Sequence, residues 1–148
     1  MEQLEAFLEA VLPKVHPPAE RARAEALLLR WATAWQGPDR GLEATRSIHG
    51  TFLHFNQKLG GIWSQAFGFR LTPRHGLALR GPDPDRARKA HKFRAHKLER
   101  APLDTLFEAW SAHPEAHPAG NAVEFLFEET PDDTWEACLQ EALACLKG

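Results

Sequence analysis

The sequence has little of several features that would assign a chain to a class of protein. Its 148 residues include two cysteines and one methionine, and its apolar runs are far shorter than the ~20 residues that a membrane-spanning helix needs. The N-terminal stretch Met1–Glu5 is acidic, where a secretory signal peptide would be basic. We therefore expect a cytoplasmic protein without a membrane segment.

The two cysteines, Cys138 and Cys145, fall in one predicted helix. Seven residues at ~1.5 Å per residue place them about 10 Å apart, which is too far for a disulfide. Their spacing matches neither a redox motif nor a zinc motif. We expect both to be small core residues.

Motifs for catalysis or cofactor binding are also missing. The chain contains no Gly-x-Ser-x-Gly, no phosphate-binding loop and no His-Glu-x-x-His. His113 and His117 are four residues apart, but each precedes a proline, so we do not expect a helix to bring them together. The sequence thus predicts no metal and no cofactor.

An enzymatic function has the weakest support of the alternatives considered. A small hydrolase that uses histidine would place its site at His49, His54 and His75, around one helix–hairpin junction. For each of these, a core or turn histidine is the simpler interpretation.

Size and composition indicate one globular domain covering residues 1–148. Hydrophobic residues make up 43% and charged residues 26%, which is ordinary for a folded protein and excludes general disorder. Few Met, Cys and Asn residues, 11 prolines and a preference for arginine are typical of a thermostable protein.

Hydrophobic periodicity predicts a helix-rich α+β domain with a small, largely antiparallel three-stranded sheet. The predicted order is αααββααβα. Helices are expected over 2–12, 17–36, 39–59, 84–99, from 102 onward and from 130 to the C-terminus, and strands over 62–71, 77–79 and 122–128.

The third helix, over 39–59, has an alternative. A strand is conceivable over 51–56, but Ile48, Phe52, Phe55 and Leu59 fall within a 60° arc on a helix, and Gly60-Gly61 would end it. Gly50 would cost that helix about 1 kcal/mol. The periodicity nevertheless favours a helix.

Charge is distributed unevenly along the chain. The formal net charge is −2, which argues against a uniformly basic nucleic-acid binder. Residues 1–40 have a net charge of −1. Residues 41–100 hold 12 basic and 4 acidic residues, net +8, and residues 101–148 hold one basic and 10 acidic residues, net −9.

The basic charge peaks in the predicted helix over 84–100, and repulsion between its neighbouring cations would be relieved by an anionic partner such as nucleic acid or another polyanion. Arginines of the preceding hairpin could extend the patch. The predicted anion-binding residues are Arg70, Arg74, Arg80, Arg86, Arg88, Lys89, Lys92, Arg94, Lys97 and Arg100.

A second hypothesis weighs about equally with nucleic-acid binding. The basic segment could be a solvated face that pairs with the acidic last third, within one chain or across a homo-oligomer. Aromatic residues are sparse in the basic segment, where Phe93 is alone, and this weakens a claim of single-strand specificity. The five tryptophans are expected in the core, or in part at a homodimer interface.

Overall fold

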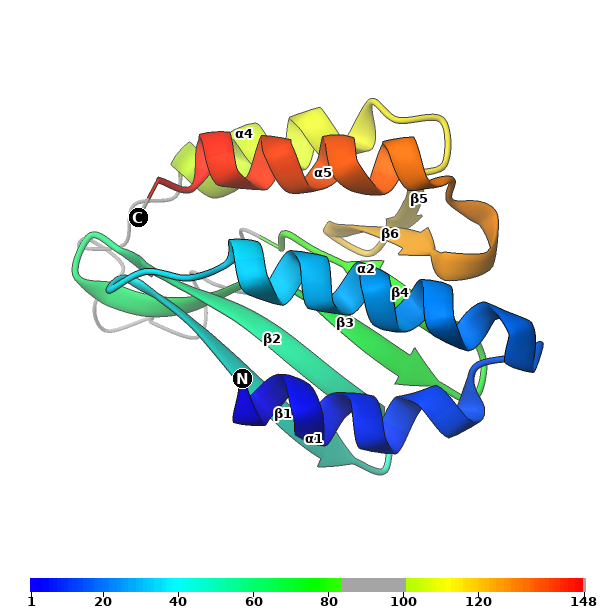
Figure 1. Ribbon diagram of the computed structural model, residues 1–148. Coiled ribbons are helices and arrows are strands. Elements are labelled where there is room, and N and C mark those ends of the chain that lie inside the picture. Colours follow the sequence, from blue (N-terminus) through cyan, green and yellow to red (C-terminus); the bar gives the residue numbers. More distant parts are fainter. Residues whose placement is uncertain (84–100, 148) are drawn as a thin grey trace.

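A six-stranded antiparallel sheet forms one layer of the protein, and helices pack on one of its faces (Figure 1). The computed structural model describes residues 1–83 and 101–147. The strand order is β1-β2-β3-β4-β6-β5. The strands are β1 (Arg40–Ser47), β2 (Gly50–Leu59), β3 (Ile62–Thr72), β4 (Gly76–Arg80), β5 (His117–Ala119) and β6 (Ala122–Leu126).

Four α-helices lie within the described residues, and short 3-10 turns accompany them. The helices are α1 (Glu2–Val11), α2 (Arg21–Ala34), α4 (Ala101–Ser111) and α5 (Asp132–Cys145). The 3-10 turns are Leu12–Lys14, Pro18–Glu20 and Phe127–Glu129. No helix in this part of the chain is both long and apolar enough to cross a membrane.

The prediction of a three-stranded sheet is wrong, chiefly because the expected helix over 39–59 is the β1–β2 hairpin. Ile48, which we assigned to the core, sits in the two-residue turn and is 94% exposed. Phe52 and Phe55 lie on opposite faces of β2, and only Phe55 is fully buried. The strand carries apolar residues on both faces, and their spacing in the sequence also fits one face of a helix. From the sequence alone, the periodicity therefore indicates a helix.

Gly50 marks the start of β2 and explains locally why a hairpin forms. Its φ of 143° is one that L side chains rarely adopt, and a Cβ there would lie 2.4 Å from the Leu71 carbonyl oxygen. The missing side chain therefore allows β2 to lie against β3 at this point. The predicted helix over 39–59 gave no reason for a glycine at this position.

The other predicted elements agree with the structure in type. Helices near 2–12, 17–36, 102 onward and 130 onward correspond to α1, α2, α4 and α5, and the hairpin over 62–80 is β3–β4. The third expected strand is β6, while β5 was missed because three residues carry no readable periodicity. The predicted helix over 84–99 lies outside the described residues.

The core lies between the helices and the sheet and is built around Trp31 on α2. Its ring packs edge-on against Phe67 and Phe69 of β3, at centroid distances of 5.7 and 5.1 Å. Trp110 of α4 and Trp135 of α5 lie 6.2 and 6.4 Å from the same ring. These contacts join three helices to the sheet, and large aromatic side chains supply much of the buried apolar area.

Four tryptophans are buried, as the core prediction expects, and the fifth is not. Trp31, Trp35, Trp110 and Trp135 are each at most 2% exposed. Trp63 on β3 is 47% exposed. It belongs to the opposite face of the sheet.

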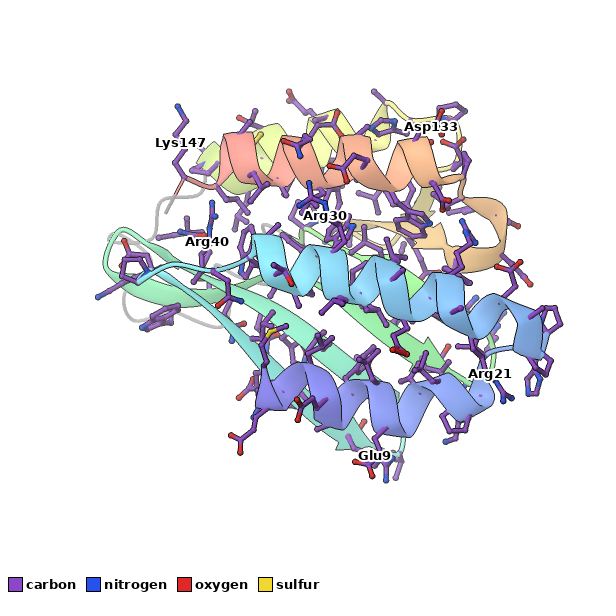
Figure 2. All side chains as sticks on the ribbon, in the orientation of Figure 1. Glu9, Arg21, Arg30, Arg40, Asp133 and Lys147 are labelled. Carbon is purple, nitrogen blue, oxygen red and sulfur yellow. The ribbon has the colours of Figure 1, made fainter. Side chains whose placement is uncertain are left out.

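Arginines of α2 pair with part of the acidic last third of the chain. Arg30 lies between α2 and α5 (Figure 2) and contacts Glu136 through two hydrogen bonds of 3.1 and 2.9 Å. Arg23 donates to Asp132 at 2.9 Å. The acidic side chains at the start of α5 are thus partly neutralised by the helix layer.

Candidate functional site

The face of the sheet that points away from the helices carries aromatic, polar and charged side chains. Residues paired directly across antiparallel strands point to the same face, so the register defines rows. One row crosses all six strands, from β1 to β5, and consists of Glu43, His54, Gly68, Arg80, Glu124 and His117. The adjacent row consists of Thr45, Phe52, Arg70, Ala78 and Leu126.

A groove of about 940 Å³ lies on this face, within the size range of ligand-binding sites. Most of its lining comes from β1, β2 and β3, and the end of β4 completes one wall. The lining residues are Thr45, Arg46, Ser47, His49, Phe52, His54, Trp63, Gln65, Ala66, Phe67, Gly68, Phe69, Arg70, Arg80, Gly81, Asp83 and Ala122.

Gly68 is one of the residues that line the groove. In the register it stands between His54 on β2 and Arg80 on β4. A Cβ at Gly68 would lie 2.8 Å from the Leu53 carbonyl oxygen, so the close approach of the strands favours glycine here. The missing side chain leaves space between an imidazole and a guanidinium.

A bulge in β3 shapes the same surface. The register shifts where Phe55 pairs with Phe67 and Asn56 pairs with Gln65, which leaves Ala66 as the extra residue. Past this bulge, Trp63 and Gln65 share the groove face and are both exposed. The bulge therefore lets β3 present Trp63 outward while Phe67 remains in the core.

Aromatic rings form flat surfaces in the groove. The rings of Phe52 and His54 are stacked, with centroids 5.8 Å apart and planes within 6°. The Thr45 hydroxyl and His54 Nε2 lie 2.9 Å apart in a hydrogen bond that holds the imidazole against β1. Together with half-exposed Trp63, the groove offers planar faces of the kind on which bases or other planar rings stack.

Two arginines that line the groove, Arg70 and Arg80, bond to residues of other strands of the sheet. Arg70 forms an ion pair with Glu124 of β6, whose side chain is 8% exposed. Its Nε atom is buried and has no hydrogen-bond partner in the described structure. Arg80 donates to the Ala119 carbonyl at 3.2 Å. Both guanidinium groups are therefore positioned without help from a ligand.

A second hollow, of about 800 Å³, continues from the groove around the end of the sheet. Arg46 and Ser47 line both spaces. Lys14, Arg74 and Glu128 line only the second hollow. A surface with several basic side chains thus extends from the groove toward the β3–β4 turn.

The structure places the predicted anion-binding residues in two groups. Arg70 and Arg80 line the groove, and Arg74 lies at the second hollow. The remaining predicted residues, from Arg86 to Arg100, lie outside the described part of the chain. Of the predicted residues, Arg70 forms an ion pair with Glu124 of the acidic last third. Pairing of the basic segment 84–100 with that region, within one chain or across a homo-oligomer, stays a prediction.

The three histidines named for a hydrolase are not gathered into one site. His49 and His54 line the groove, and His75 lines the second hollow. The His75 amide donates to the Thr72 hydroxyl in the β3–β4 turn, as expected of a turn residue.

Sequence reasoning missed the aromatic part of the groove. The helical interpretation of 39–59 put Phe52 in the core, and the core prediction included Trp63. The two-residue alternation of Leu53 and Phe55 with Phe52 and His54 was the signal that could have found it.

Metal-ligating side chains meet elsewhere in the described structure. His113, Cys138 and Glu141 bring one ligand atom each to within 4.8 Å of one another on the helix side.

In comparisons with known proteins, no family model matches the chain, and no curated protein or solved structure matches it significantly.

Proposed function

We propose that the protein is a binding protein that holds single-stranded nucleic acid on the face of its sheet opposite α1, α2, α4 and α5. The observation that carries the proposal is the exposed Trp63 on the same face as the Phe52–His54 stack and two anchored arginines. Single-strand binders combine stacking surfaces for bases with positive charge for the backbone. The groove supplies both.

The dimensions of the groove suit a short strand. Trp63 and Arg70 are seven positions apart on β3, which corresponds to about 20 Å along the strand. At ~3.4 Å or more per nucleotide, this length accommodates several nucleotides. A duplex keeps its bases stacked inside and could not use the planar surface of Trp63.

Charge in the lining favours an anion. Three arginines, Arg46, Arg70 and Arg80, and one acidic residue, Asp83, line the groove, and Arg70 pairs with Glu124. The basic segment 84–100 follows Asp83 directly in the sequence. Its contribution to binding, through duplex backbones or other polyanions, stays a prediction.

The test is a fluorescence-anisotropy titration with labelled single-stranded DNA and RNA of about 15 nucleotides, near the upper site size of such binders. Trp63→Ala is expected to weaken affinity about tenfold, because stacking on an aromatic side chain contributes ~1–3 kcal/mol per base. Leu29→Ala is the matched control, since Leu29 is 48% exposed but lies on α2, in the helix layer.

Two results would overturn the proposal. One is an affinity no better than millimolar at ~50 mM salt, where phosphate contacts are strongest. The other is binding that Trp63→Ala leaves unchanged. Duplex DNA that binds more tightly than single strands, with no effect of Trp63→Ala, would assign binding to the basic segment instead. The double variant Arg88→Glu with Lys92→Glu would then abolish it.

A further inference from the structure

Three metal-ligating side chains of different chemistry meet where the end of α4 lies beside α5. Cys138 and Glu141 are three residues apart on α5 and therefore share a helix face. His113 follows α4 and faces them, with its Nε2 atom 2.8 Å from Glu141 Oε1. The thiol of Cys138 is buried, whereas the His113 and Glu141 side chains are 20% and 31% exposed. The cluster is thus open to solvent on one side.

The backbone around the cluster is fixed by hydrogen bonds. The Trp110 indole Nε1 donates to the Cys138 carbonyl at 3.1 Å, which joins the end of α4 to α5 beside one member of the cluster. The His113 amide donates to the Trp110 carbonyl, and the Ala116 amide donates to the His113 carbonyl. The His113 ring packs against Phe125 at 6.1 Å. These contacts fix the His113 ring and the backbone at Cys138 before any ligand binds.

The ligand atoms lie within 4.8 Å of one another. Zinc bonds of ~2.3 Å to sulfur and ~2.0–2.1 Å to nitrogen or oxygen place tetrahedral ligands about 3.3–3.7 Å apart. The His113 Nε2–Glu141 Oε1 distance of 2.8 Å and the outer limit of 4.8 Å for the group bracket these values. We propose that His113, Cys138 and Glu141 bind a divalent cation of the zinc class, with water in the fourth position.

The donor set selects among metals. One sulfur, one imidazole nitrogen and one carboxylate oxygen suit Zn²⁺, whereas Mg²⁺ and Ca²⁺ prefer oxygen ligands alone. Glu115 adds a further carboxylate near the cluster, and the Thr134 hydroxyl donates to it at 3.3 Å. A bound cation would be stabilised by this surplus of negative charge.

The metal must displace the proton of the thiol. Burial raises the pKa of Cys138, and the charges of Glu141 and Glu115 raise it further. Titrations are therefore made at about pH 8 rather than in acid, where proton competition weakens metal binding.

The chain contains its own control for this cluster. His117 and Glu129 form a histidine–carboxylate contact of 2.7 Å, close to the 2.8 Å of the His113–Glu141 contact. The described structure places no cysteine with this second pair in a three-ligand group. If a histidine–glutamate contact alone bound metal, the two pairs would behave alike.

The experiment is a Co²⁺ titration of chelator-treated protein, followed by Zn²⁺ displacement. We expect a sulfur-to-cobalt charge-transfer band and the visible bands of tetrahedral Co²⁺, both lost on adding Zn²⁺. Cys138→Ser is expected to remove the charge-transfer band. His113→Gln and Glu141→Gln should weaken affinity by about tenfold or more, as loss of metal-site partners does. His117→Gln and Cys145→Ser should leave both readouts unchanged.

The absence of a charge-transfer band in the unmodified protein would overturn the proposal. So would a band that Cys145→Ser removes and Cys138→Ser retains, or an affinity that His113→Gln and Glu141→Gln leave unaltered. Circular dichroism of each variant checks folding. Because His113 and Glu141 are partly exposed, their variants keep the test valid if Cys138→Ser does not fold.

Discussion

Arg70 on β3 and Glu124 on β6 form an ion pair across the intervening strand β4. Ala78 of β4 is the direct neighbour of Arg70 and is small enough for the guanidinium to pass over it. The Glu124 side chain is 8% exposed and that of Arg70 is 19% exposed. The pair therefore connects two strands of the sheet beside the groove.

Removing one partner of this ion pair should lower the stability of the fold. Arg70→Met leaves the Glu124 carboxylate buried without its cation, and we expect a loss of about 3 kcal/mol in the free energy of unfolding. The double variant Arg70→Met with Glu124→Met should recover most of that loss, because neither charge remains. Urea denaturation of the three proteins measures the coupling. A double variant whose loss equals the sum of both single losses would contradict this account.

Charge at the groove should appear in the salt dependence of binding. Arg46 lines both the groove and the second hollow, so Arg46→Gln should reduce the slope of log affinity against log salt by about 0.7, the value for one phosphate contact on a single strand. Arg30→Gln is the control, because Arg30 lies in the helix layer (Figure 2). Equal slopes for the two variants would place the nucleic acid elsewhere.

Gly50 should tolerate no side chain. Gly50→Ala combines an unfavourable φ with a Cβ 2.4 Å from the Leu71 carbonyl oxygen, and we expect a loss of about 1–3 kcal/mol. Gly41→Ala on β1 has open space around the new methyl group and should change stability by less than about 1 kcal/mol. Thermal unfolding followed by circular dichroism distinguishes the two.

The Arg30–Glu136 contact between α2 and α5 should make a small, pH-dependent contribution to the free energy of unfolding. Hydrogen bonding to Arg30 and Gln140 lowers the pKa of Glu136 from its usual 4.5. A lowered carboxyl pKa stabilises the fold above the unfolded-state pKa, and this contribution disappears as the pH falls through the folded-state value. Glu136→Gln should therefore be less stable than the unmodified protein at pH 7. The difference in urea midpoint should vanish in acid, and a constant difference would assign the effect to packing.

Much of the helical layer could be predicted from the sequence because its signals are local. The stripe of Leu4, Phe7 and Val11 defines α1, and the prolines before α2 and α5 mark where helices begin. The β3–β4 hairpin was predictable for the same reason. Alternating residues and a turn containing Pro73 and Gly76 lie within twenty residues of each other.

The candidate site was less predictable because strand pairing creates it. Arg70 and Arg80 were identified as anion-binding residues, but their positions around Gly68 depend on the register of β2, β3 and β4. Trp63 could not be separated from the four core tryptophans, since its exposure depends on a bulge and on which face the helices cover. His113 and Cys138 are 25 residues apart in sequence and meet only through the packing of α4 on α5.

The sequence by itself determined the mixed α+β class, most helix positions and the uneven charge, because these follow from residue types and short-range periodicity. Tertiary structure alone decided that residues 40–59 form two strands, because the approach of Leu71 to Gly50 and the burial of Leu53 and Phe55 under α1 and α2 outweigh a helical stripe. It also decided which aromatic side chains stay outside. Burial depends on contacts between distant segments, and such contacts leave no local pattern in the chain.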